Sequence, residues 1–171
     1  MKTNYLHRLA TLIAVAALSL TASAIGGDGL YFLQDFENAA DYPDTQNSQE
    51  QAFMVVGQGE WLYCNAFQST NSSYNENGST MNLRMYKNGS YVVTPVLTNG
   101  VSKVTFYIGR ASVTAFTSTD GGATWTEAAI STIGKTCTVE VHSEAVNRIK
   151  LANDASKDAD IDNIAVYAQT F

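Results

Sequence analysis

From about residue 30 onward, the chain is a succession of short runs in which apolar and polar residues alternate. Clusters of Gly, Asn, Asp and Ser separate these runs. A period of two residues is that of a β-strand with one buried face, and Val, Ile, Thr, Tyr and Phe favour strands. We predict about eleven strands, at residues 30–36, 52–56, 60–67, 81–86, 90–97, 101–108, 112–118, 125–129, 136–142, 148–152 and 161–168. So many short strands with frequent turn signals predict an all-β fold, an antiparallel β-sandwich or barrel.

The alternation also predicts which side chains face the core. In the run VSKVTFYIG, Val104 and Phe106 fall on one side, whereas Lys103 and Tyr107 fall on the other. One side of such a strand packs against the core and the other faces water. Residues 68–80 are polar and rich in turn formers, with one aromatic residue, Tyr74. We predict a long surface loop there, either a binding loop or a connection without a role.

The N-terminus has the pattern of an export signal. A short charged region is followed by the apolar run LATLIAVAALSL and by the small residues Ala22 and Ala24. We predict a secretory signal peptide at residues 1–24 and a single domain at residues 25–171, secreted or periplasmic, with no membrane insertion after cleavage. Cleavage takes the net charge from −6 to −8, because Lys2 and Arg8 are lost. Such an acidic domain is not expected to bind nucleic acid or an anionic membrane.

The chain contains two cysteines, Cys64 and Cys137. An oxidising compartment outside the cytoplasm permits a disulfide between them, and closing so long a loop would stabilise the fold by roughly 4 kcal/mol. The alternative is that both are small buried apolar side chains without a bridge. The sequence leaves both alternatives open.

The stretch STDGGATW, residues 118–125, has the Asp-box spacing. The pattern consists of Ser118, Asp120, Gly122, Thr124 and Trp125. It resembles the hairpin turns of sialidases, in which Asp accepts hydrogen bonds from turn amides and glycine supplies positive φ. We expect Trp125 to pack back under the turn and to be largely buried. A single such turn in a short chain with few arginines predicts a structural turn rather than a sialidase.

The two ends of the predicted domain carry a second resemblance. The first strand ends in Asp35-Phe36-Glu37, the last contains Ile161-Asp162-Asn163-Ile164, and between them lie SYVVTPVLTNGV and the DGGATW turn. These features resemble secreted β-jelly-roll, galactose-binding-like domains, such as carbohydrate-binding modules and the jelly-roll modules of exported Bacteroidetes proteins. The resemblance implies a jelly roll in which the first and last strands lie side by side.

That resemblance also implies a metal site. Jelly rolls of this kind frequently hold one structural calcium near the junction of the first and last strands, where hard oxygen ligands gather. The matching positions are Glu37 and Asp162, with Asp35 as a further candidate. The alternative is that these residues are solvated acids at strand ends.

Binding is a simpler function for this sequence than catalysis. His142 is the one histidine after residue 24, no G-x-S-x-G motif is present, and the many acids fall in no recognisable catalytic motif. A binding site needs outward aromatic and hydrogen-bonding side chains. We predict a ligand site made of Arg84, Tyr86, Lys103 and Tyr107, which form one patch if their strands lie in one sheet, with Tyr74 from the loop. The alternative is that these tyrosines only stiffen the sheet.

We therefore expect an exported, non-catalytic binding module whose partner is a glycan or a cell-surface polysaccharide. Two alternatives remain open at the level of the sequence. One is an adhesin-like or structural β-sandwich that binds protein, and the other is a small glycan-active enzyme.

Overall fold

The computed structural model describes residues 29–38, 40, 42 and 46–169, which form strands and one short 3-10 helix. The predicted signal peptide, residues 1–24, lies outside the described residues. The elements are β1 (Gly29–Gln34), β2 (Gln51–Val55), β3 (Gly59–Cys64), β4 (Ala66–Ser69), η1 (Ser72–Tyr74), β5 (Asn82–Met85), β6 (Ser90–Val93), β7 (Val101–Arg110), β8 (Thr114–Ser118), β9 (Thr126–Ala128), β10 (Ser131–Ile133), β11 (Thr136–Ser143), β12 (Arg148–Asn153) and β13 (Ala159–Ala168).

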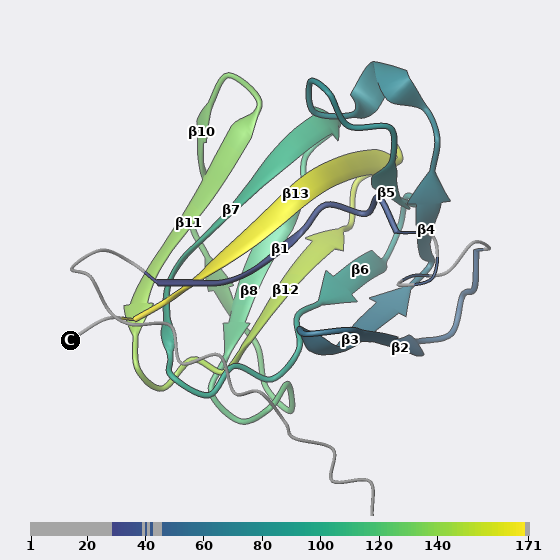
Figure 1. Cartoon of the computed structure of the whole chain (residues 1–171). Coiled ribbons are helices and arrows are strands. Elements are labelled where there is room, and N and C mark those ends of the chain that lie inside the picture. The colour runs from purple at the N-terminus through teal and green to yellow at the C-terminus, as the bar shows by residue number, and fades with distance from the viewer. Residues whose placement is uncertain (1–28, 39, 41, 43–45, 170–171) are drawn as a thin grey trace, which may run out of the picture.

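Two antiparallel sheets pack face to face (Figure 1). Sheet A has the strand order β10-β11-β7-β13-β5-β4, and β1 also pairs with β13. Sheet B has the order β2-β3-β6-β12-β8-β9. The predicted antiparallel β-sandwich is confirmed. No helix within the described part of the chain is long and apolar enough to cross a membrane.

The first and last strands lie side by side, as the resemblance to jelly rolls predicts. Gln34 of β1 is opposite Ile164 of β13, and Leu33 is opposite Ala165. β13 pairs along its whole length with β7 on one edge. On the other edge it pairs with β5 at residues 159–161 and with β1 at residues 164–168. Asp162 and Asn163 therefore lie in a gap between the ends of β5 and β1.

The core lies between the sheets and is built from the inward residues of each strand. As predicted, Val104 and Phe106 of β7 are buried, whereas Lys103 and Tyr107 are only partly buried. Large side chains that are almost wholly buried come from both sheets: Trp61, Tyr63, Leu83, Met85, Ile149, Ile161 and Ile164. Burial of each such side chain contributes about 1.5–3 kcal/mol to the free energy of folding.

The structure differs from the predicted strands at two places. The predicted strand at residues 60–67 is two strands, because Asn65 has φ = 53° and turns the chain from β3 in sheet B to β4 in sheet A. β10 was not predicted, because its three residues are all exposed and so show no alternation. It pairs with β11 at the edge of sheet A, where no second layer requires an apolar face.

Candidate functional site

The outward face of sheet A carries a shallow depression of about 250 Å³. Its lining includes Tyr107 and Thr105 of β7, with Thr136 from β11 and Asn163 from β13. Glu76, from the loop after η1, closes one side. The remaining lining residues are Leu33, Phe106 and Ala165. The depression thus combines an aromatic ring, two hydroxyl groups, an amide and a carboxylate.

A bulge in β13 places Asn163 at this depression. Asp162 is opposite Tyr107, but the next pair joins Ala165 to Thr105, so β13 has one residue more than β7 between the two pairs. Asn163 has φ = 49°, a left-handed conformation that Asn tolerates better than most residues. Its amide Nδ2 donates a hydrogen bond to Oε2 of Glu76. Bulges next to binding sites often redirect a side chain in this way.

The loop between β4 and β5 is fixed onto sheet A. Its 3-10 turn passes so close to β7 that a Cβ atom on Gly109 would lie 1.9 Å from the carbonyl oxygen of Tyr74. The Arg110 guanidinium lies 4.8 Å from the centre of the Tyr74 ring. The predicted loop at residues 68–80 is therefore held in one place, and Glu76 reaches the depression from it.

Glu37 anchors the end of this loop. Its carboxylate accepts hydrogen bonds from the hydroxyl of Ser79 (2.6 Å) and from the backbone N–H groups of Thr80 and Met81 (2.9 Å each). Partial burial raises the pKa of Glu37, but these hydrogen bonds together outweigh it and leave the pKa below its ordinary value. Glu37 is thus held ionised at neutral pH.

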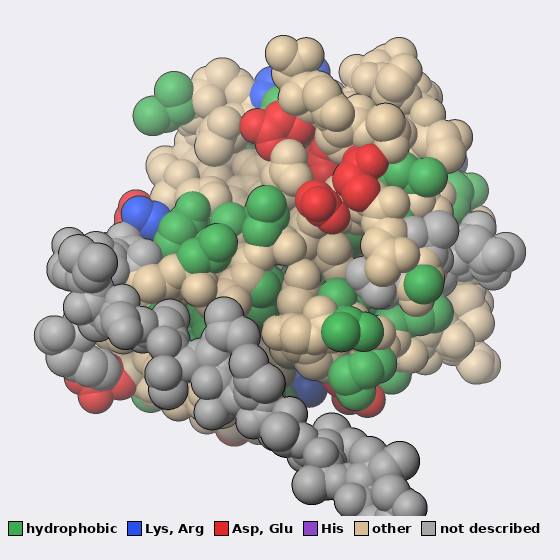
Figure 2. Space-filling view, in the orientation of Figure 1, with side chains coloured by type: hydrophobic (Ala, Val, Ile, Leu, Met, Phe, Trp, Pro, Cys, Tyr) green, Lys and Arg blue, Asp and Glu red, His purple; other side chains and the backbone are tan. Residues whose placement is uncertain are grey.

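Asp162, in the gap between β5 and β1, is fully buried. Its carboxylate accepts from the backbone N–H groups of Glu76 (3.1 Å) and Asn163 (2.8 Å). Burial raises the pKa of Asp162 to about 6, and the negative charge of Glu37 adds to the increase. Figure 2 shows acidic side chains gathered on this face of the molecule.

Two of the three predicted calcium ligands lie at this gap. Glu37 and Asp162 do lie close to one another, and the hydroxyl of Ser79 contacts both. The Oδ1 of Asp35 accepts the N–H of Glu37 at 3.2 Å, and no contact between Asp35 and Asp162 occurs among the described residues. Calcium takes six to eight oxygen ligands, and no group of three or more acidic, His or Cys side chains suited to a metal occurs among the described residues. The arrangement fits two of the three predicted ligands, and calcium stays a prediction.

The predicted ligand patch is not continuous. β5 and β7 belong to the same sheet, but β13 lies between them. Arg84 is level with Asp160 of β13, and Lys103 is level with Tyr167. Seven residues along a strand correspond to roughly 23 Å, so Arg84 and Lys103 lie at opposite ends of the sheet.

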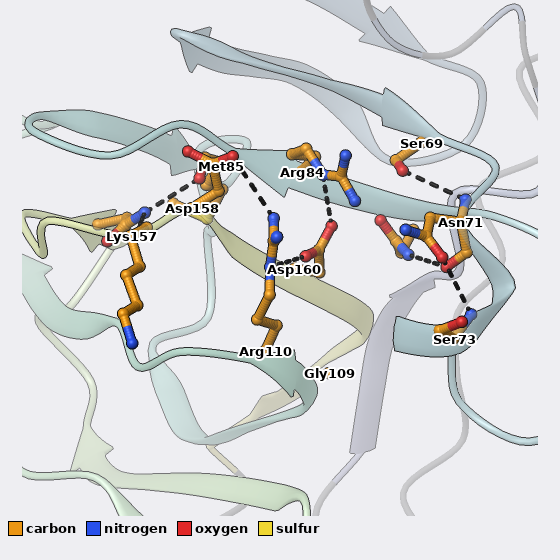
Figure 3. A network of polar contacts seen from close by, with 12 residues as sticks. Ser69, Asn71, Ser73, Arg84, Met85, Gly109, Arg110, Lys157, Asp158 and Asp160 are labelled. Carbon is orange, nitrogen blue, oxygen red and sulfur yellow. Dashed lines mark hydrogen bonds and ion pairs between the residues drawn. The ribbon is translucent and has the colours of Figure 1, made fainter.

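Arg84 is engaged with the protein itself. Its Nε lies 2.9 Å from Oδ1 of the fully buried Asp160, and Arg110 Nε lies 2.7 Å from Oδ2 of the same carboxylate. Figure 3 shows Asp160 between the two arginines. Arg110 also pairs with Asp158 at 3.5 Å. This network joins β5, β13 and β7, which gives Arg84 a structural role.

The other predicted ligand residues also contact neighbouring side chains. The ring of Tyr86 stacks on Phe67, with centroids 5.3 Å apart. The Lys103 ammonium lies 4.9 Å from the centre of the Tyr167 ring. Among the five predicted residues, the depression includes Tyr107. Glu76 and Asn163 were not predicted as site residues. The surface loop that carries Glu76 was predicted, but its attachment to sheet A and the bulge at Asn163 have no signature in the sequence.

The Asp-box residues form the predicted hydrogen-bonded turn. Asp120 Oδ1 accepts from Ser118 Oγ (2.7 Å) and from the N–H of Thr124 (2.9 Å), and Asp120 Oδ2 accepts from the Thr124 hydroxyl (2.6 Å). The N–H of Gly122 donates to Ser118 Oγ at 2.8 Å, and Gly122 has φ = 98°. None of the five Asp-box residues lines the depression in sheet A.

The expectation that Trp125 is largely buried is wrong, because the side chain is only partly buried. One edge of the indole covers the turn, since a Cβ atom on Gly122 would lie 3.1 Å from it. The ring also faces the outward surface of sheet B, where the Lys150 ammonium lies 4.6 Å from its centre. A single turn is too small to enclose an indole ring.

Cys64 and Cys137 are both free thiols, so the alternative of a disulfide is wrong. Cys64 belongs to β3 in sheet B, and its Sγ donates to the carbonyl oxygen of Ser48 at 3.4 Å. Cys137 belongs to β11 in sheet A and is buried. The two cysteines thus belong to different sheets, and each has its own local contacts.

Comparisons with known proteins add one observation. No family model matches the chain, and no curated protein matches it. Among solved structures, the chain is similar to the K2 cleaved adhesin domain of Lys-gingipain, with a TM-score of 0.52 and 14% sequence identity. The likeness covers 79% of this chain and 96% of that domain. At this identity the likeness concerns the fold alone: the two chains share a β-sandwich fold.

Proposed function

We propose that this chain is a non-catalytic binding domain of the adhesin type, which acts outside the cytoplasm and binds a partner at the depression in sheet A. The fold of an adhesin domain and the signal-like N-terminus support this proposal. The observation that carries it is the depression itself, where Tyr107, Thr105, Thr136, Asn163 and Glu76 converge on an ordered face.

The size of the depression limits what it can hold. Pockets for drug-sized ligands have volumes of roughly 300–1,000 Å³, and this one has about 250 Å³. It therefore accommodates a single small group, such as the terminal residue of a larger molecule displayed on a surface. Such a small group binds weakly at one site, and strong attachment comes from many copies of the group binding many copies of the domain at once.

The chemistry of the lining fits one sugar residue. A pyranose ring presents an apolar C–H face to Tyr107, while its hydroxyl groups meet the hydroxyls of Thr105 and Thr136 and the amide of Asn163. The neighbouring carboxylates of Glu37, Glu76 and Asp162 make this region negative, so the preferred sugar is neutral rather than acidic.

The test is a screen of residues 25–171 against arrayed glycans, comparing wild type with Tyr107→Ala. Tyr167→Ala is the matched control, because Tyr167 is also a partly buried tyrosine of sheet A but lies near Lys103 and outside the depression. We expect binding to neutral glycans that falls at least tenfold in Tyr107→Ala and persists in Tyr167→Ala.

A protein partner is the alternative ligand, and the exposed Leu33 at the edge of the depression favours it. In that case no glycan binds, but a surface protein is captured by the wild type and not by Tyr107→Ala. Binding that is equal in both tyrosine variants would refute the depression as the site.

A further inference from the structure

The outward face of sheet B carries three aromatic rings around a single lysine. The ammonium of Lys150 lies 4.6 Å from the ring centres of Phe116 and Trp125, and 5.9 Å from that of Tyr91. A cation over an aromatic face within about 6 Å is attracted by the ring electrons. Three rings at such distances surround the ammonium on one open surface.

The strand register places these side chains on the same face. Lys150 of β12 is opposite Phe116 of β8, and Tyr91 of β6 is opposite Ala152 of β12. The neighbours Ile149 and Leu151 of Lys150 are buried in the core, so Lys150 points outward. Trp125 joins the group from the Asp-box turn, one residue before β9.

The charge of Asp154 reaches Lys150, but the two groups form no ion pair. Among the residues that the structure describes, no carboxylate lies within ion-pair distance of its ammonium, whereas the outward Arg84 and Arg110 of sheet A each pair with a buried aspartate. Partial burial lowers the pKa of Lys150, and the negative charge of Asp154 opposes this shift. A cationic donor group is therefore held on an aromatic surface without an ion pair among the described residues.

We propose that this face binds a saccharide that carries a carboxylate, with the sugar ring on the aromatic side chains and the carboxylate on Nζ of Lys150. Aromatic rings stack on the C–H face of a pyranose, and an ammonium forms charge-assisted hydrogen bonds with a carboxylate. The site is distinct from the depression on sheet A and does not depend on the function proposed for it.

The surroundings set the kind of acidic saccharide. Glu50 accepts a hydrogen bond from the Tyr91 hydroxyl at 2.9 Å, Glu127 is opposite Phe116, and the charge of Asp154 reaches Lys150. These acids repel a densely charged polyanion. They favour a short saccharide with no more than one carboxylate on each ring, such as a uronate trimer, over long chains or chains that are sulfated several times per ring.

Saccharide binding at this face can be followed by the fluorescence of Trp125. The other tryptophan, Trp61, is fully buried, so a change in indole fluorescence on adding a saccharide reports on Trp125. The wild-type domain is titrated with a trigalacturonate and with its methyl ester, which has the same rings but no charge. We expect a saturable change with the free acid and binding at least about tenfold weaker with the ester, the loss of one charge-assisted contact.

Lys150→Met is the decisive variant, because methionine keeps an apolar stem between the rings and removes the charge. It should bind the acid and the ester equally weakly. Lys103→Met is the matched control, since Lys103 also lies over a tyrosine ring, but on sheet A; it should bind the acid as wild type does. The proposal is overturned if neither saccharide changes the fluorescence, if the acid and ester bind the wild type equally, or if Lys103→Met loses as much affinity as Lys150→Met.

Discussion

At the scale of single residues, the Asp-box turn shows how one carboxylate orders a hairpin. Asp120 is exposed, yet it accepts three hydrogen bonds from Ser118 and Thr124. The hydrogen bonds from the Thr124 hydroxyl and backbone are the main reason that the pKa of Asp120 lies well below its ordinary 3.8. The folded protein therefore binds this proton less tightly than the unfolded chain does.

Asp120 therefore stabilises the folded protein more at neutral pH than in acid. The contribution of Asp120 is fully present above its unfolded pKa of 3.8 and is lost as the pH falls through its lower folded value. We expect Asp120→Ala to melt below wild type at pH 7, with the difference shrinking towards pH 2. The measurement is thermal unfolding at several pH values, with Glu127→Ala as a control for loss of an exposed acid. A difference independent of pH would contradict this account.

At the scale of elements, Asp160 connects three neighbouring strands of sheet A. It is fully buried on β13, between Arg84 of β5 and Arg110 of β7. Removing one member of a buried ion pair costs several kcal/mol, because it leaves the partner charge without compensation. Here one carboxylate compensates two guanidinium groups, both of which are partly exposed.

We expect Asp160→Asn to lower the free energy of unfolding by about 3 kcal/mol, measured by urea denaturation. Asp158→Asn is the matched control. Asp158 is partly exposed and pairs with Arg110 at 3.5 Å, so its loss should cost well under about 1 kcal/mol. If both substitutions lowered the free energy of unfolding equally, the burial of Asp160 would contribute nothing to the stability of the network.

The gap between β5 and β1 is the second place where elements meet. If calcium binds Glu37 and Asp162 there, calcium at about 100 times its Kd adds about 2.7 kcal/mol to the stability. For a domain of this size the melting temperature rises by roughly 5–10 °C. Chelation with EDTA should reverse the rise, and Asp162→Asn should remove it. No change on chelation of a calcium-loaded sample would rule the metal out.

The same gap has a pH dependence opposite to that of Asp120. The pKa of Asp162 is raised to about 6, so the folded protein binds this proton more tightly than the unfolded chain, whose value is 3.8. In the chelated protein its contribution is fully present below 3.8 and is lost as the pH rises through 6. Calcium requires the ionised form, so its effect on the melting temperature should be large at pH 7.5 and small at pH 5.

At the scale of the whole molecule, the two sheets are held together by core packing without a covalent link between Cys64 and Cys137. We expect the melting temperature to be unchanged by a reducing agent. Thiol titration of the denatured protein, without reductant, should count two free cysteines. A disulfide closing so long a loop would be worth roughly 4 kcal/mol, so its reduction would lower the melting temperature clearly.

The sequence alone determined the fold class and much of the strand arrangement. The alternation in residues 101–108 assigned Val104 and Phe106 to the core, because a strand has only two faces. The terminal motifs around Phe36 and Asp162 correctly predicted that β1 lies beside β13. The Asp-box spacing correctly predicted the hydrogen bonds of Asp120, because all of its partners lie within four residues. Local physics suffices for the two faces of a strand and for a tight turn, whereas the pairing of β1 with β13 was predicted from the resemblance to jelly rolls.

Only the tertiary structure decided which outward side chains meet. Arg84 and Lys103 belong to one sheet, but the register of β13 places them at opposite ends of it. Tyr107 meets Asn163 and Glu76 because a bulge and an anchored loop bring them together, and the sequence predicted the loop but neither its anchoring nor the bulge. Likewise, Lys150 lies among Tyr91, Phe116 and Trp125 because β6, β12, β8 and β9 are neighbours. Alternation fixes the face of each residue, whereas strand order and register, set by packing across the whole core, fix its neighbours.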